Sequence, residues 1–223
     1  MYKKDIYSIK KLIYIIGGNM KKFITVSPFQ RITKGGLLKG IYNSFENERL
    51  NCEIETCYPI IPVINGYAEK GDKIQVVIIV SNYPFAKENA DNIKTDVIKL
   101  AELIQFEYEF IIVQADYDES LDSCLKLFAS LLGRFQDDDK LYACISFGTK
   151  PTPLIIMMAL NYAFRSKINV VVDCIAYGKL DFNTKKSYIY DVTALFYMDE
   201  IVNNLAKMNV KDPKNKIRQI LEL

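Results

Sequence analysis

Short apolar runs rich in β-branched residues recur along this chain, separated by segments in which apolar residues follow a helical period. The clearest run, residues 74–80, is continuously apolar, which is typical of a strand buried on both faces of a parallel sheet. The pattern predicts five such strands. They are expected at residues 23–26, 74–80, 110–113, 141–147 and 168–172.

The intervening segments predict helices, most of which place apolar residues three and four positions apart and so have one apolar face, whereas the segment 153–164 is apolar nearly all round and predicts a buried helix. They are expected at residues 86–105, 121–132, 153–164 and 193–208, with a last helix from residue 212. Asp212 followed by Pro213 supplies an N-cap and a proline at the first helical position.

Three further segments have a weaker pattern. Residues 37–42 predict the start of a helix, and residues 185–190 predict one arm of an antiparallel hairpin. Residues 52–64 alternate weakly and contain Pro59 and Pro62, which favours an edge or hairpin segment over a central strand.

Strands that alternate with helices of this length imply right-handed crossovers and a mostly parallel sheet. We therefore predict an α/β fold: a Rossmann-like, mostly parallel sheet flanked by helices, with a C-terminal β-hairpin and two terminal helices. Residues 20–223 are expected to form one domain, which includes the terminal helices at 193–223. Met20 begins a fresh segment before the first strand, so residues 1–19 are predicted to be an N-terminal extension.

Composition narrows the location and the partners of the protein. The 223 residues carry a net charge of only +2 and show no basic stripe, which disfavours a binder of duplex nucleic acid. The N-terminal apolar run is far too short to span a membrane. The five scattered cysteines, three of them in apolar segments, predict buried free thiols and a cytoplasmic protein. Residues 137–139, three aspartates, predict a solvated loop.

The chain contains no histidine, which restricts its possible chemistry. Triads that use a histidine base and ribonuclease mechanisms with two histidines are excluded. A zinc site is disfavoured too, since no cluster of ligands exists, and neither a metal nor a cofactor is predicted. Any chemistry must use lysine, arginine, carboxylates, tyrosine, serine or the substrate itself.

The most promising residues for binding follow the strand at 141–147. Gly148 allows close approach of the backbone, Thr149 supplies a hydroxyl and Lys150 a cation. Pro151 and Thr152 lead into the next helix, with Thr152 as the expected cap and the helix N-terminus offering free N–H groups to a phosphate. The alternative is a tight turn with a solvated lysine. The segment is not a Walker motif.

Two other strand ends carry suitable residues. Ser27, Pro28 and Phe29 follow the first strand, where a donor could contact the same ligand and Phe29 could stack on a base. The alternative is a turn with Phe29 packed on the core. Asn82 and Tyr83 follow the strand at 74–80 and could add a polar contact.

The turn that follows the strand at 141–147 resembles that of a known family. A strand that ends in a Gly-Thr-Lys-Pro turn and leads into an apolar helix is similar to the CARF domains, the CRISPR-associated Rossmann-fold sensors of type III antiviral systems. Residues 58–64, 70–73, 158–163 and 189–199 also resemble one bacterial branch, and their order and spacing extend the resemblance over residues 20–223.

The resemblance implies a homodimer whose cleft binds cyclic oligoadenylate, a ring of three to six adenylates. Gly148, Thr149 and Lys150 would grip phosphate and ribose, and Ser27 and Phe29 would line the cleft. Family members that carry a HEPN ribonuclease use a histidine, which this chain lacks. Only about two helices follow residue 192, so the sequence resembles a stand-alone sensor.

Three functions stay open. The first is a metal-independent ring nuclease, in which Lys150 stabilises charge on the phosphate while Ser27 or Thr149 positions the ribose hydroxyl that attacks it. Its products would be linear adenylates with 2′,3′-cyclic phosphate ends. The second is a receptor that binds the ring without cleaving it and signals to a partner. The third is an unrelated nucleotide or sugar-phosphate protein. The ring size depends on the width of the cleft.

Overall fold

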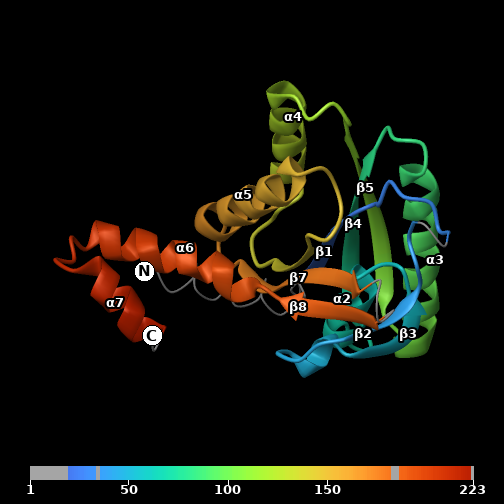
Figure 1. The fold of residues 1–223 in the computed structure, drawn as a ribbon, viewed down its shortest axis with the longest axis horizontal. Helices are drawn as coiled ribbons and strands as arrows, with labels where there is room; N and C mark the ends of the chain where they lie inside the picture. The colour runs from blue at the N-terminus through green and yellow to red at the C-terminus, as the bar shows by residue number, and fades with distance from the viewer. Residues whose placement is uncertain (1–19, 34–35, 182–185, 222–223) are drawn as a thin grey trace, which may run out of the picture.

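An eight-stranded mixed sheet forms the centre of the protein in a computed structural model (Figure 1). The structure describes residues 20–33, 36–181 and 186–221. The strands lie in the order β3-β2-β8-β7-β6-β1-β4-β5, antiparallel at β2–β3 and β7–β8 and parallel elsewhere. Their bounds are β1 Lys21–Val26, β2 Gly40–Asn43, β3 Cys52–Thr56, β4 Lys73–Ser81, β5 Glu107–Ala115, β6 Lys140–Cys144, β7 Val171–Asp181 and β8 Lys186–Asp191.

Helices cover both faces of this sheet. One face is covered by α2 and α3, and the other by α4, α5 and the start of α6. Figure 1 shows α6 and α7 projecting away from the sheet. The helix bounds are η1 Glu48–Leu50, α2 Ile60–Tyr67, α3 Ala86–Ile104, α4 Leu121–Leu132, α5 Pro151–Ser166, α6 Thr193–Lys207 and α7 Pro213–Ile220. The predicted α/β fold, with its C-terminal hairpin and two terminal helices, is therefore confirmed.

The alternation of side chains along β1 separates two apolar layers. Phe23 points to the face covered by α2, where its ring stacks on Tyr142 with centroids 4.6 Å apart. Ile24 points to the opposite face, where it joins the layer formed with α4 and α5. Burial of apolar side chains of this size contributes roughly 1.5–3 kcal/mol each, so the central strands are held from both sides.

The strand order reverses direction beside β1. After β1 the chain first forms β2 and β3 at the far edge of the sheet. It then places β4 and β5 on one side of β1 and returns to place β6 on the other side. In open α/β sheets, ligands bind beyond the carboxyl ends of the strands at such a reversal. The loops after β1 and β6, both proposed from the sequence as binding loops, therefore flank this position.

One local prediction was wrong, and another is confirmed only in part. Residues 37–42 do not start a helix, because Tyr42 lies in β2, which pairs with β3 and β8. The segment 52–64 forms the edge strand β3 only as far as Thr56, after which α2 begins at Ile60. Pro62 is tolerated there because it lies in the first turn, where its missing N–H has no helical partner to lose.

The aspartates at 137–139 are not uniformly solvated. Asp139 is fully buried, and its carboxylate accepts from Lys22 Nζ at 2.8 Å and from the backbone N–H of Gln136 at 2.7 Å. Lys22 also donates to the carbonyl of Arg134 at 2.6 Å. The ion pair therefore ties the start of β1 to the loop before β6, a long-range contact that the local sequence does not reveal.

The remaining sequence predictions concern the thiols and the ends of the chain. Cys52, Cys57, Cys144 and Cys174 are buried free thiols, whereas Cys124 is partly exposed. The predicted extension at residues 1–19 lies outside the described residues. None of the helices in the described ranges is long and apolar enough to cross a membrane.

Candidate functional site

The turn from β6 into α5 is built around Gly148. Its φ of +110° is a conformation that residues with a side chain rarely adopt. A Cβ atom at this position would lie 2.8 Å from Cβ of Thr152, so the backbone approaches the helix too closely for any other residue. The hydroxyl oxygens of Thr149 and Thr152 lie 3.0 Å apart, and Thr152 N–H donates to the Thr149 carbonyl. The turn is therefore a fixed, hydrogen-bonded unit.

The start of α5 differs from the prediction. The helix begins at Pro151, two residues earlier than expected, and its N-cap is Lys150 instead of Thr152. Pro151 and Pro153 have no N–H, and that of Thr152 is already bonded within the turn. The expected row of free N–H donors is thus largely absent. What the helix start offers an anion is its partial positive charge.

Lys150 supplies the full positive charge of the turn. It is exposed, and none of the ion pairs between described side chains involves it. By contrast, the hydroxyl of Ser146 accepts from the backbone N–H of Gly178 at 2.7 Å, which anchors the turn to β7. The lysine is therefore available to a ligand, whereas the residues beneath it hold the turn in place.

The loop after β1 is anchored to α3. Ser27 is fully buried, and its hydroxyl donates to the carbonyl of Ala86. Its backbone N–H donates to Ile79, which continues the pairing of β1 with β4. The neighbouring Pro28 is buried as well. In this conformation the Ser27 hydroxyl is held by the protein and does not reach a ligand.

Phe29 belongs to a cluster of three aromatic rings from three strand ends. Its ring lies 5.6 Å from that of Tyr83 and 5.3 Å from that of Tyr117, and the two tyrosine rings lie 4.5 Å apart. Tyr83 and Tyr117 are 37% and 41% exposed, while Phe29 is half-buried. The expectation that Phe29 packs on the core is therefore met in part, and the exposed aromatic surface is supplied mainly by the tyrosines.

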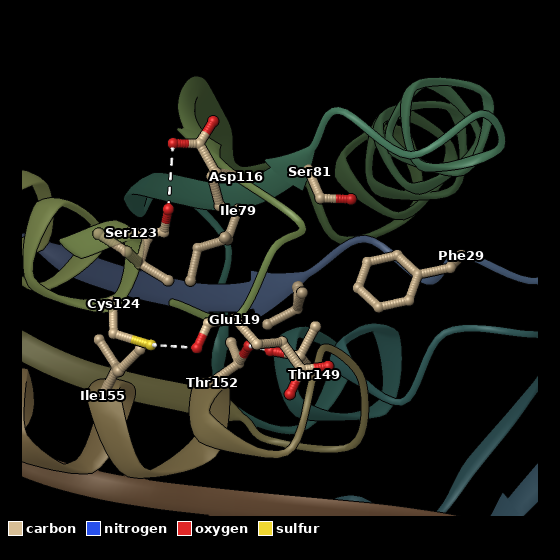
Figure 2. A pocket seen from close by; sticks show the side chains of 13 residues that line it. Phe29, Ile79, Ser81, Asp116, Glu119, Ser123, Cys124, Thr149, Thr152 and Ile155 are labelled. Atoms are coloured by element: carbon tan, nitrogen blue, oxygen red, sulfur yellow. Dashed lines mark hydrogen bonds between the residues drawn. The ribbon is translucent and has the colours of Figure 1, made fainter. Parts of the chain in front are cut away.

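A small pocket joins the two predicted loops (Figure 2). Phe29 lies on one side of it, and Thr149 and Thr152 lie on the other. The pocket holds about 20 Å³ of free space, room for little more than one water molecule. Asn82 and Tyr83 line a separate groove of about 520 Å³ between α3 and β5. The pocket between the two predicted loops is therefore too small for a nucleotide, whereas the groove beside Asn82 and Tyr83 is large enough for one.

Sequence reasoning missed the contribution of the β5–α4 connection to this pocket. Asp116 and Glu119 line it, and Asp116 accepts from the hydroxyl of Ser123 at 3.4 Å. Glu119 has a φ of +56°, an unusual conformation for a residue with a side chain. The signal was available, because β5 is parallel to β4 and must end at the same edge of the sheet.

The pocket is acidic because of these two carboxylates, whereas the neighbouring turn is basic because of Lys150. Asp116 and Glu119 disfavour a phosphate inside the pocket, whereas the exposed Lys150, next in sequence to the pocket residue Thr149, favours one on the turn outside it. Neutral groups that donate hydrogen bonds, such as a ribose hydroxyl or an amine of a base, suit the acidic side. The site thus fits a ligand with its phosphate on the turn and its sugar or base toward the strand ends.

Comparisons with known proteins do not place the chain in a family. No model of a known family matches it, and a search of curated proteins finds no match. The resemblance to CARF domains therefore rests on the motifs of the sequence alone.

Proposed function

We propose that the protein binds cyclic oligoadenylate, a ring-shaped second messenger of type III CRISPR antiviral defence. The supporting observation is the turn at 148–150, where an exposed lysine that pairs with none of the described carboxylates stands at the start of a helix, beside the reversal of the sheet. A phosphodiester carries one negative charge, which Lys150 and the helix dipole would both attract. The exposed tyrosines at the neighbouring strand ends offer surfaces for bases.

The ring would be bound between two copies of the chain. The pocket beneath the turn is too small for a nucleotide, so one chain offers only one wall of a cleft. Leu154 and Met158, one and two turns after Lys150, are 67% and 57% exposed and form an apolar stripe on α5. Pairing of two such stripes would bring the two lysine turns together about a two-fold axis, which matches the symmetry of the ring.

The same site is proposed to cleave the ring without a metal ion. The ribose 2′-hydroxyl loses its proton to water as its oxygen attacks the adjacent phosphorus. The bond from phosphorus to the 5′-oxygen breaks, and that oxygen takes up a proton from water. The products are linear adenylates that end in 2′,3′-cyclic phosphate. Lys150 stabilises the charge on the phosphate oxygens, and Thr149 orients the attacking hydroxyl. Ser27 was the third residue expected to take part in cleavage. While its hydroxyl donates to the Ala86 carbonyl, its role is to fix the loop after β1.

A receptor that binds the ring without cleaving it is the second candidate. It is favoured by the hydrogen bond from Ser27 to the Ala86 carbonyl, because this bond occupies the hydroxyl of one of the three residues expected to act in cleavage. In that case the terminal helices α6 and α7, which project from the sheet, would pass the binding event to a partner protein.

Incubation with cyclic tri-, tetra- and hexa-adenylate in EDTA, followed by chromatography, separates the two candidates. Linear products that disappear in Lys150→Ala support the nuclease. Tight binding without products supports the receptor. If none of the three rings is bound or cleaved, the proposed function is wrong.

A further inference from the structure

One buried side chain, Asn89 of α3, holds the loop that follows β1. Asn89 is 2% exposed and lies one turn into the helix. Its Nδ2 lies 2.9 Å from the carbonyl oxygen of Pro28, 2.9 Å from that of Gln30 and 3.0 Å from that of Phe85. Two of these carbonyls flank Phe29, so a single amide group fixes the backbone on both sides of that residue.

The orientation of this amide is determined by its surroundings. Its Oδ1 accepts from the hydroxyl of Tyr58 at 2.9 Å, and Tyr58 is itself 2% exposed. A flipped amide would place an oxygen against three carbonyl oxygens, which have no hydrogen to donate. Burial makes such unpaired contacts costly, so the Tyr58 hydroxyl and the three carbonyls select the same orientation.

We propose that Asn89 is a positioning residue that presents Phe29 to the ligand-binding edge of the sheet. Held at Pro28 and Gln30, the loop keeps the ring of Phe29 against Tyr83 and Tyr117 and lets it line the pocket opposite Thr149. Asn89 itself is buried behind the loop and does not touch the ligand. The predicted effect of Asn89 on ligand binding rests on the proposed function. Its effect on the loop does not, because the loop can be measured in the free protein.

The test compares Asn89→Asp with Ile93→Val, one turn further along α3. Asn89→Asp keeps an acceptor for Tyr58 but replaces the two N–H donors with one O–H at most, so it cannot hold the carbonyls of Pro28 and Gln30 together. Ile93→Val trims a fully buried side chain and leaves the loop untouched, which provides a control that is also destabilised. Amide hydrogen exchange is measured in the free protein at Ser27 and Leu37, whose N–H groups donate to the carbonyls of Ile79 and Arg31 on either side of the loop. The affinity for cyclic tri-, tetra- and hexa-adenylate is measured in parallel.

We expect Asn89→Asp to speed amide exchange at Ser27 and Leu37 by about tenfold or more and to weaken ring binding by a similar factor. Ile93→Val should change neither. Tyr58→Phe removes only the hydrogen bond to the amide oxygen of Asn89, so it should give a smaller change in the same direction. This variant replaces Asn89→Asp in the test if Asn89→Asp does not fold. Equal exchange in the Asn89, Tyr58 and Ile93 variants overturns the proposal. So does faster exchange with unchanged affinity for a ring that the wild type binds. If the wild type binds no ring, the proposed function fails, while the exchange data still decide whether Asn89 holds the loop.

Discussion

Gly148 and Thr152 contact each other so closely that a methyl group on Gly148 would lie 2.8 Å from the threonine Cβ. Together with the φ of +110°, this contact predicts that Gly148→Ala distorts the turn. We expect the substitution to lower the free energy of unfolding by about 1–3 kcal/mol, measured by urea denaturation. Gly133→Ala, at a glycine with no close neighbour and ordinary φ, is the matched control and should change stability little. Equal stability of the Gly148 variant and the wild type would show that the turn is not constrained as described.

The buried pair of Lys22 and Asp139 should be costly to break from one side. Lys22→Met leaves a buried carboxylate without its cation, so we expect a loss of about 3–5 kcal/mol in the free energy of unfolding. The double variant Lys22→Met with Asp139→Leu removes both charges and should lose less. Urea denaturation of Lys22→Met, Asp139→Leu and the double variant gives the interaction energy of the pair as a double-mutant cycle. A double variant as unstable as the sum of both single variants would contradict the pairing.

Alkaline pH should destabilise the protein through its buried thiols. Burial raises the pKa of Cys57 to about 11 and that of Cys174 to about 12. In the unfolded chain these thiols ionise near pH 8.5, so above that pH the unfolded state has released protons that the folded state still binds. The free energy of unfolding should therefore fall between about pH 9 and pH 11, by at most about 1.4 kcal/mol per pH unit for each thiol.

Urea denaturation at several pH values between 8 and 11 measures this slope. Cys174→Ala should make the slope shallower, because one buried thiol no longer contributes. A slope that is unchanged in this variant would mean that Cys174 ionises equally easily in the folded and unfolded states.

Dimer formation, if it uses the exposed stripe on α5, should be sensitive to charge there. Leu154→Glu places a carboxylate in the proposed interface, and we expect the variant to elute as a monomer in size-exclusion chromatography with light scattering. Leu103→Glu on α3 is a matched control, since Leu103 is 70% exposed and lies on the opposite face of the sheet. A dimer that survives Leu154→Glu would exclude this surface.

The parts of the fold that follow from local pattern could be predicted from the sequence. The run at 74–80 is apolar throughout and forms β4, and the periodicity at 86–105 matches α3. The segment around Tyr42 was misread because its state is set by pairing with strands that are distant in sequence, β8 above all.

In the candidate site, too, the residues that are adjacent in sequence could be predicted, whereas the long-range contacts could not. Gly148, Thr149 and Lys150 form one turn, so their order in the sequence already places them together. The hydroxyl of Ser27 could not be assigned, because its acceptor Ala86 lies 59 residues away. For the same reason, the hydrogen bond from Asn89 to the Pro28 carbonyl could not be predicted from the sequence.

The most direct test of the central claim is a calorimetric titration of the protein with cyclic tri-, tetra- and hexa-adenylate, with Lys150→Ala and Lys150→Arg measured alongside. We predict that one of the rings binds with a stoichiometry of one ring to two chains. Lys150→Ala should weaken its binding by about tenfold or more, and Lys150→Arg, which keeps the charge, should weaken it less. Binding of no ring, or a ring bound one to one with an affinity that Lys150→Ala leaves unchanged, would contradict the account.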